Sequence, residues 1–472
     1  MNPHAFHHYD FGPTACLANP NVIASIQQQI RNAGALSPAD IRLGRTMGLI
    51  GTERINTIGL NDGVFYPPDV PAPVPLERQA TVRAASRAPA PASRTLHALA
   101  LLVDFADNPG TRPATDFQAM LFDATNPGSM TSIYKDLSYS ALTVTGEAIG
   151  YVRVPRAYSD YTAGESGMGS NFPDNTPGLL VDALTEFCKT DSLQRFDTDG
   201  DGYVDGIFLI HAGGGAEAEP DPTLRPDKIW SHKWVLPQPF MNQGVRVYAY
   251  STEPEDGRVG VFAHEFGHVL GLPDLYDTSY RSSGAGEWCL MGGGSWGGEG
   301  DKPTRMSCWC LAQLGWIKPR NVSKSIAGKS LKLAAIAESK THCHRLAKNA
   351  ATSSPEYFLL EHRPKSGRDS ELPGGGLLVW HVDERQSGNT NPLAYKVGLV
   401  QADGKRDLEF GRKGDKGDPF PGSKKVTAID DSTTPSTRAN DGSPSGIRLS
   451  SIALGQNPEL ATLKAKITRT SP

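Results

Sequence analysis

The sequence predicts an α+β fold in which a large domain of interleaved strands and helices is followed by a smaller β-rich region. Between residues 95 and 322, apolar runs of strand length alternate with amphipathic stretches. From about Leu331 onward, short β runs are separated by Gly, Pro and Asp turns. The composition agrees, because 50 Gly and 36 Pro among 472 residues favour loops and β structure over helical bundles.

The expected elements follow one another along the chain. Residues 21–34 carry four aliphatic residues at helical spacing before Gly34, which predicts a short helix. In the large domain we expect strands at 96–105, 142–154 and 206–211, and helices near 117, at 133–137 and at 177–189. In the β-rich region we expect strands at 357–360, 377–382 and 395–400.

A Pro/Ala-rich stretch separates the N-terminal segment, residues 1–66, from the rest. Residues 67–94 contain almost no large apolar side chains, which predicts an exposed linker. Arg78, Arg83, Arg87 and Arg94 make the linker a target for trypsin-like proteases. A plain spacer explains the same composition equally well.

Charge and cysteine content exclude several classes of protein. The 47 basic and 51 acidic residues give a net charge of −4 without a basic stripe, so nucleic acid is not an expected partner. No apolar stretch approaches the roughly 20 residues of a membrane span. Six cysteines are too few for a disulfide scaffold, although Cys289 could pair with Cys308. No signal-peptide pattern is visible at the N-terminus.

The segment VGVFAHEFGHVLGLPDLYD, residues 259–277, carries most of the chemistry. His264 and His268 are four residues apart, so on a helix both imidazoles can reach one ion. Glu265 is turned by about 100° from His264 and can contact a metal-bound water without being a ligand. This is the H-E-x-x-H arrangement of zinc peptidases.

The residues after the second histidine complete a longer motif. Gly271 ends the helix and allows the chain to reverse, Pro273 prevents helix continuation, and Asp274 follows. The string H-E-x-x-H-x-x-G-x-x-D is the metzincin layout with Asp in place of the third His. His264, His268 and Asp274 leave a fourth zinc position for water. A thermolysin-like site, whose third ligand is a Glu on a later helix, is the competing arrangement.

Met291 lies in a glycine turn shortly after this motif, within WCLMGGGSW at residues 288–296. Metzincins place a methionine in a tight turn below the metal. We therefore expect Met291 to be a packing floor for the histidine ligands and not a ligand itself.

The loop DTDGDGYVD, residues 197–205, has the spacing of an EF-type calcium loop. The expected ligands are four alternating carboxylates and one backbone carbonyl: Asp197, Asp199, Asp201, Asp205 and Tyr203. Phe208 stands where an EF-hand has its bidentate Glu, so we expect a calcium loop without an EF-hand, and a solvated acidic turn is the alternative. A second acidic cluster, within residues 403–418, leaves calcium and ordinary turn chemistry equally open.

These motifs resemble the immune inhibitor A family of secreted bacterial zinc metallopeptidases. The matching segments include HEFGHVLGLPDLYD, CLMGGGSW, LALLVDFADNP, LSYSALTVTGEAIGYVRVP, FDTDGDGYVDGIFLIHAGGGAE and LPGGGLLVWHVDE, and they lie within residues 96–422. The resemblance implies a pro-segment at 1–66, a metzincin-like catalytic domain at 95–322 and a β-rich domain at 323–472. It also implies endoproteolysis of protein substrates by a secreted zymogen, which conflicts with the missing signal peptide.

The residues predict a zinc endopeptidase, expected to act as a monomer. Zinc lowers the pKa of its bound water and polarises the scissile carbonyl, and Glu265 moves the water proton to the leaving amine. No transition-state-stabilising residue is assigned, since Tyr276 and Tyr280 are only sequence neighbours of the motif. The alternative from another class is a non-catalytic extracellular binding protein on a metal-stabilised scaffold.

Cys16 lies upstream of the linker and is a candidate latency ligand. A thiolate is a strong zinc ligand, so Cys16 could occupy the open zinc position and keep the enzyme inactive. An incidental or disulfide-bonded cysteine is the simpler interpretation.

Overall fold

Three β-sheets organise the part of the chain that the structure describes. We describe the protein from a computed structural model, in which residues 14–33, 94–322, 330–348, 351, 353–455 and 460–467 are placed. The linker expected at 67–94, apart from Arg94, and most of the segment expected at 1–66 lie outside the described residues.

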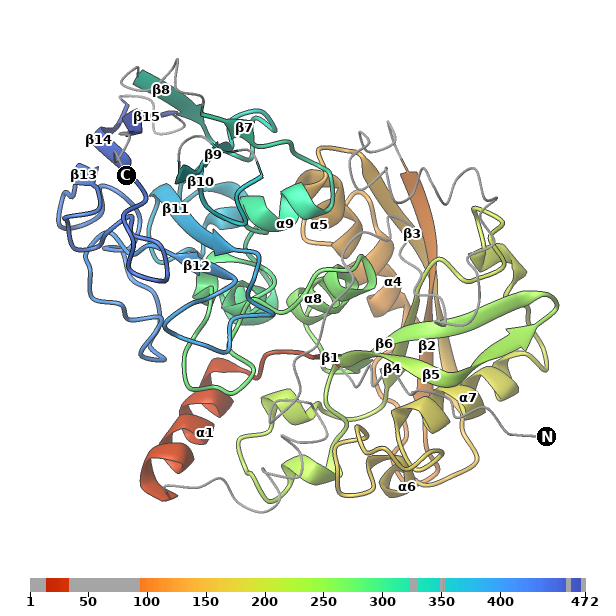
Figure 1. The fold of residues 1–472 in the computed structure, drawn as a ribbon. Helices are drawn as coiled ribbons and strands as arrows, with labels where there is room; N and C mark the ends of the chain where they lie inside the picture. The colour runs from red at the N-terminus through yellow and green to blue at the C-terminus, as the bar shows by residue number, and fades with distance from the viewer. Residues whose placement is uncertain are drawn as a thin grey trace, which may run out of the picture.

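The first sheet is mixed and has six strands (Figure 1). In spatial order they are β1 (Thr14–Ala15), β5 (His232–Asn242), β6 (Val245–Pro254), β4 (Ile207–His211), β2 (Arg94–Asp104) and β3 (Leu142–Arg153). The pairs β2–β3, β2–β4 and β4–β6 are parallel, whereas β5 runs antiparallel to both β6 and β1. The N-terminal strand therefore extends the sheet beyond β5.

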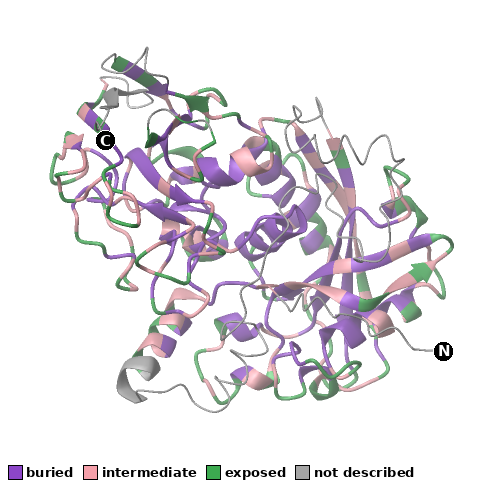
Figure 2. Ribbon diagram, viewed as in Figure 1, coloured by how far each residue is buried: buried purple, intermediate pink, exposed green. Residues whose placement is uncertain are grey.

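Strand β2 is buried on both faces, as Figure 2 shows for the centre of the sheet. Leu99 and Leu101 pack into one core, and Ala100 and Leu102 pack into the other. Because side chains alternate across a strand, the continuous apolar run of β2 fills both layers. Helices on the Leu102 side are α4 (Ala114–Phe122), α5 (Met130–Leu137) and α8 (Val259–Val269), and those on the Leu99 side are α6 (Tyr158–Thr162) and α7 (Thr176–Phe187).

Two smaller sheets form the β-rich region. The second sheet has the order β12 (Val397–Leu399), β11 (Gly376–Asp383), β10 (Glu356–Arg363), β9 (His344–Leu346) and β7 (Arg320–Asn321). The third has the order β13 (Ala428–Ile429), β14 (Ile447–Leu454), β15 (Leu460–Ile467) and β8 (Ser330–Ala334).

Most expected elements are confirmed. The strands expected at 96–105, 142–154 and 206–211 are β2, β3 and β4, and those expected in the β-rich region are β10, β11 and β12. The expected helices are α4, α5, α7 and, near the N-terminus, α1 (Pro20–Ala33). The β5–β6 hairpin was not expected. None of the described helices is long and apolar enough to cross a membrane.

One hydrophobic core runs from the first sheet into the β-rich region. Phe262 and Phe266 of α8 belong to the same buried cluster as Trp309 of α9 (Cys308–Gln313) and Leu359 and Trp380 of the second sheet. The boundary expected at residue 322 therefore crosses a shared core, and the domain division remains a prediction.

The cysteine pairing suggested for Cys289 and Cys308 is wrong. The Sγ atom of Cys289 lies 3.8 Å from Sγ of Cys310, and all six cysteines are free thiols. Cys308 and Cys310 are two residues apart on α9, which turns them about 200° from each other. Only one of them can face Cys289.

Candidate metal centre and active site

Helix α8 carries the two histidines at the centre of the candidate site. Val259, Phe262 and Phe266 anchor the helix in the core beneath the first sheet. The helix ends at Val269, and Gly271 has a φ of +95°, a left-handed conformation that favours glycine and that reverses the chain. This reversal brings Asp274 back to the two histidines.

Three donor atoms converge at this place. Nε2 of His264 lies 3.1 Å from Nε2 of His268 and 3.1 Å from Oδ1 of Asp274. Nε2 of His268 lies 3.2 Å from the same Oδ1 atom. Tetrahedral zinc with bonds of about 2.0–2.1 Å separates its ligand atoms by about 3.3 Å, so the observed triangle has the size of three zinc ligands.

The hydrogen bonds of the imidazoles support a cation between them. Nδ1 of His264 lies 2.9 Å from the carbonyl oxygen of Leu290, and Nδ1 of His268 lies 2.8 Å from that of Leu272. A carbonyl only accepts, so each Nδ1 carries the proton and each Nε2 presents a lone pair. Two lone pairs and a carboxylate then face one another, and a metal ion satisfies all three.

Glu265 lies beside this triangle without a partner. Its side chain is fully buried, and neither carboxylate oxygen has a hydrogen-bond partner among the described residues. Burial raises the pKa of Glu265 well above its ordinary value, and the carboxylates of Glu253 and Asp274 add to the rise. A buried carboxyl with free oxygens next to a metal site is suited to hold and transfer a proton.

The environment of Asp274 keeps it ionised. Burial raises the pKa of Asp274, but positive charge on His268 and His264 holds it below its ordinary value when no cation lies between them; a bound cation would supply that charge instead. A carboxylate in this state is ready to bind a metal ion.

Met291 lies beneath the histidine helix. A Cβ atom added to Gly267 would lie 2.4 Å from Sδ of Met291, so the sulfur packs against α8 between the two histidine turns. The same turn supplies the carbonyl of Leu290 to His264, and the Met291 carbonyl accepts from the amide of Leu275 at 2.7 Å. The geometry agrees with a packing floor below the histidines.

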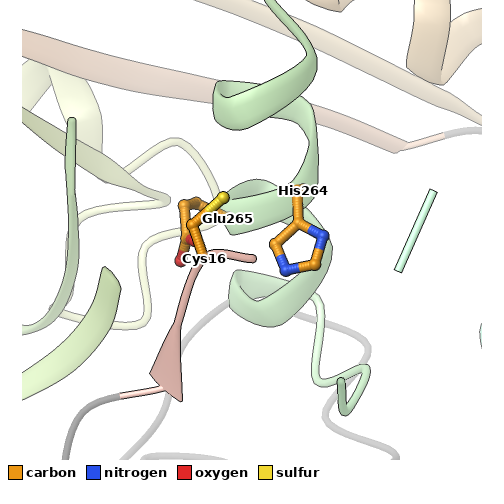
Figure 3. A group of neighbouring side chains, drawn as sticks. All are labelled: Cys16, His264 and Glu265. Carbon is orange, nitrogen blue, oxygen red and sulfur yellow. The ribbon is translucent and has the colours of Figure 1, made fainter. Parts of the chain in front are cut away.

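The N-terminal segment around Cys16 enters the same site (Figure 3). Cys16 is fully buried, and its sulfur, a ring nitrogen of His264 and a carboxylate oxygen of Glu265 all lie within 4.8 Å of one another. Burial raises the pKa of the Cys16 thiol, and Glu265 adds to the rise. The structure thus brings a residue from the start of the chain to residues about 250 positions later.

Aromatic side chains hold this segment in place. The Trp230 indole donates to the carbonyl of Cys16 at 2.8 Å, and the Trp296 indole donates to that of Leu17 at 2.8 Å. The Tyr276 hydroxyl donates to the carbonyl of Ala15 at 2.5 Å.

Sequence reasoning missed these three aromatic contacts. Trp230, Trp296 and Tyr276 come from three separate parts of the chain, and their meeting point depends on the fold. The one local signal is that Tyr276 follows Asp274 by two residues.

The expected calcium loop is partly assembled. Carboxylate oxygens of Asp197, Asp199 and Asp205 lie within 4.8 Å of one another. Asp201 does not belong to this group, and its carboxylate accepts from the amide of Tyr203 at 2.8 Å. Three of the five expected ligands therefore meet.

Neighbouring groups already bind two of these carboxylates. Arg94 binds Asp199 at 2.9 Å, and Asp205 accepts from the amide of His97 at 2.7 Å. Burial raises the pKa of Asp205 above its ordinary value.

The second acidic cluster contains its own cation. Carboxylate oxygens of Asp403, Asp415 and Asp418 meet within 4.8 Å, and the ammonium of Lys405 lies 2.8 Å from Asp403 and in contact with Asp415. Lysine partly neutralises this cluster, which favours turn chemistry over a calcium site.

A profile of the "Immune inhibitor A peptidase M6, catalytic domain" matches residues 90–317. This part of the chain belongs to the immune inhibitor A peptidase family. The matched range begins and ends five residues before the domain expected at 95–322. The zinc motif, Cys289 and Met291 all lie inside it.

Named relatives of this family share part of the chain. Immune inhibitor A of Bacillus thuringiensis subsp. alesti is 34% identical over 263 residues, which cover 44% of this chain and 38% of that protein. The pre-pro-metalloprotease PrtV of Vibrio cholerae serotype O1 is 30% identical over 270 residues, or 46% of this chain and 29% of PrtV. A putative secreted metallopeptidase of Arthroderma benhamiae is 41% identical over 59 residues, or 12% and 9%. The chain thus spans less than half the length of the relatives it matches.

Proposed function

We propose that this protein is a secreted, zinc-dependent endopeptidase of metzincin-like fold that hydrolyses protein substrates. The observation that carries the proposal is the triangle of His264, His268 and Asp274 donor atoms, with the unpartnered carboxyl of Glu265 beside it. The family match and the relative named as a metalloprotease support the same activity. Secretion rests on the name of the relative from Arthroderma benhamiae.

In the proposed mechanism, His264, His268 and Asp274 hold the zinc. When bound, zinc polarises the scissile carbonyl and makes a water molecule acidic. Glu265 takes a proton from the attacking water as the new C–O bond forms. It then gives that proton to the amine as the C–N bond breaks.

Glu265→Ala tests the general base directly. We expect the variant to keep its zinc, because Glu265 is not a ligand, and to lose about 10²- to 10⁴-fold in casein cleavage. Glu186→Ala, on the distant helix α7, is the matched control and should cleave casein normally. Substantial activity of Glu265→Ala would remove this residue from the mechanism.

Asp274→Ala separates the proposed site from a thermolysin-like one. We expect the variant to lose most of its bound zinc, measured by atomic absorption, because a third ligand is gone. Wild-type zinc content in Asp274→Ala would place the third ligand elsewhere. A non-catalytic binding protein, by contrast, would bind zinc at all three residues and cleave nothing.

We also propose that residues 1–66 are a pro-segment, in which Cys16 is a latency ligand. The support is the burial of the thiol beside His264 and Glu265 and its place directly after Thr14 and Ala15, which pair with β5. A thiolate there would take the zinc position that a substrate water needs.

Cys16→Ser tests latency in the uncleaved chain. We expect its casein cleavage to rise above that of the wild type, while Cys188→Ser, a half-buried thiol at the end of α7, stays unchanged. With cobalt in place of zinc, the wild type should show a thiolate-to-cobalt absorption band that Cys16→Ser lacks. An unchanged spectrum and unchanged activity would exclude the role.

The loop at residues 197–205 is proposed as a structural calcium site, with Asp197, Asp199 and Asp205 as its centre. Calcium at 100 times its Kd should raise the free energy of unfolding by about 2.7 kcal/mol. Asp197→Asn should reduce this gain, measured by urea unfolding with calcium and with chelator. If the wild type unfolds identically with calcium and with chelator, the loop is an ordinary acidic turn and not a calcium site.

A further inference from the structure

The N-terminal segment lies in the site in the manner of an extended peptide. Thr14 pairs with Lys233 and Ala15 with His232 in antiparallel register, and the amide of Cys16 donates to the carbonyl of Ser231 at 2.8 Å. Adding a strand to an exposed sheet edge is a common way to bind peptide backbones. A peptide substrate can therefore pair with the edge of β5 and lie against the metal centre.

Three consecutive carbonyls of this segment each receive a side-chain hydrogen bond. Tyr276 donates to Ala15, Trp230 to Cys16 and Trp296 to Leu17. These donors bind backbone atoms, so they do not depend on the side chains of the bound peptide. The same donors can hold a substrate of different sequence.

Of the three donors, Tyr276 is close to the metal ligands both in sequence and in space. It follows Asp274 by two residues, and its ring centre lies 6.3 Å from that of His264. The carbonyl that it binds belongs to the peptide bond between Ala15 and Cys16, and the Cys16 sulfur lies within 4.8 Å of atoms of His264 and Glu265. The hydroxyl thus binds the carbonyl of the peptide bond that precedes Cys16, the residue whose sulfur enters the site.

We propose that Tyr276 is a catalytic residue whose hydroxyl donates a hydrogen bond to the scissile carbonyl oxygen and stabilises its negative charge in the transition state. As water adds to the carbonyl carbon, the C=O electron pair moves onto this oxygen, and Glu265 receives the water proton. When the C–N bond breaks, the carbonyl re-forms and the amine takes the proton from Glu265. Tyr276 keeps its proton throughout.

This inference rests on the proposed endopeptidase activity. A purely structural role for Tyr276 predicts the opposite change in casein cleavage. If the hydroxyl only anchors Ala15, its loss weakens the hold on the N-terminal segment. Casein cleavage by the uncleaved chain would then rise, as for Cys16→Ser. If the hydroxyl stabilises the transition state, cleavage falls whether or not the segment is in place.

The experiment compares Tyr276→Phe with Tyr280→Phe, a buried tyrosine close to it, in the full chain before and after limited trypsin treatment. For Tyr276→Phe we expect kcat to fall about 100-fold, as for loss of one oxyanion donor, with KM within about twofold. Zinc content should match the wild type, and Tyr280→Phe should retain the wild-type kcat. A phosphinic peptide, which mimics the tetrahedral transition state, should bind Tyr276→Phe more weakly by about the fold loss in kcat/KM, measured by calorimetry.

An unchanged or increased kcat of Tyr276→Phe, or undiminished binding of the phosphinic peptide, would overturn the role of Tyr276. Failure of the wild type to cleave casein would instead refute the endopeptidase activity. If Tyr276→Phe does not fold, Tyr276→His, which retains a donor, takes its place. Its kcat should then lie between the wild-type value and a 100-fold loss, and a wild-type kcat together with undiminished phosphinic binding would overturn the role.

Discussion

At the scale of single residues, burial favours the neutral form of two imidazoles on the first sheet. His211 and His232 are fully buried on β4 and β5, and burial lowers the pKa of each to about 4. His232 is held between the carbonyl of Trp230 at 2.7 Å and the hydroxyl of Tyr250 at 3.0 Å. This strand pairs with the N-terminal segment, and Ala15 lies opposite His232 in that pairing.

The depressed pKa of His232 predicts acid sensitivity. The unfolded chain binds the proton at an ordinary pKa of 6.5 and the folded chain only at about 4. The neutral imidazole therefore stabilises the fold fully above pH 6.5, and this contribution is lost as pH falls toward 4. A shift of this size corresponds to about 3 kcal/mol at most.

Urea unfolding of zinc-loaded protein between pH 6.5 and 4 measures this effect. We expect the free energy of unfolding of His232→Gln to fall less steeply than that of the wild type. If the free energies of unfolding of the two proteins fall in parallel as the pH falls, His232 does not take up a proton on unfolding.

At the scale of elements, α8 and the turn at Met291 form one unit. The helix positions the two histidines, and the turn fills the space below them and holds the His264 ring through Leu290. A Cβ atom at position 267 would lie 2.4 Å from the Met291 sulfur, so a larger residue there would force this side chain to move. The two positions should therefore be energetically coupled.

Gly267→Ala should lower the free energy of unfolding by about 1–3 kcal/mol through overpacking. Adding Met291→Ala removes the clashing sulfur, so the double variant should be more stable than the sum of the single effects predicts. Urea unfolding of the wild type, the two single variants and the double variant measures the coupling free energy. Strict additivity would mean that the two residues do not touch.

Local sequence patterns were sufficient to predict much of the fold and the meeting of His264, His268 and Asp274. The helix α8 and the spacing of His264, His268 and Asp274 depend on residues within one short segment. The strand β5 escaped prediction because Pro237 and Pro239 interrupt it, and prolines argue against a strand. The ladder tolerates them where its register shifts, between Val235 and Phe240.

Long-range contacts could not be predicted from the sequence. The strand β1 has two residues, and its partner in β5 lies more than 200 positions away. Without that pairing, the role predicted for Cys16 rests only on its place upstream of the linker, and Tyr276 remains a neighbour of the zinc motif without a role. The contacts of the N-terminal segment with the site become visible only when both parts of the chain are placed.

At the scale of the whole molecule, a hydrogen bond from the amide of Arg305 to Asp369 links an ion pair in the catalytic region to a buried ion pair in the β-rich region. The Arg363 guanidinium contacts both carboxylate oxygens of Asp369, which also accepts from the amide of Arg305 at 3.0 Å. Arg305 continues the chain of contacts to Asp136 of α5 at 2.6 Å. Together with the shared core, this network predicts that the two regions unfold together.

Asp369→Asn should destabilise both regions at once. It leaves the buried Arg363 charge without a full partner, at an expected cost of about 3–5 kcal/mol. Asp301→Asn, which breaks an exposed pair with Arg258, should cost no more than about 1 kcal/mol. Urea unfolding followed by tryptophan fluorescence and circular dichroism should give one transition in each variant. Two separate transitions would show that the regions are independent.

The most direct test of the proposed activity is casein cleavage by the trypsin-treated protein before and after metal removal. A chelator should abolish cleavage, and stoichiometric zinc should restore it in the wild type but not in Glu265→Ala. Undiminished cleavage by protein that atomic absorption shows to be metal-free would contradict a zinc peptidase centred on His264, His268 and Asp274.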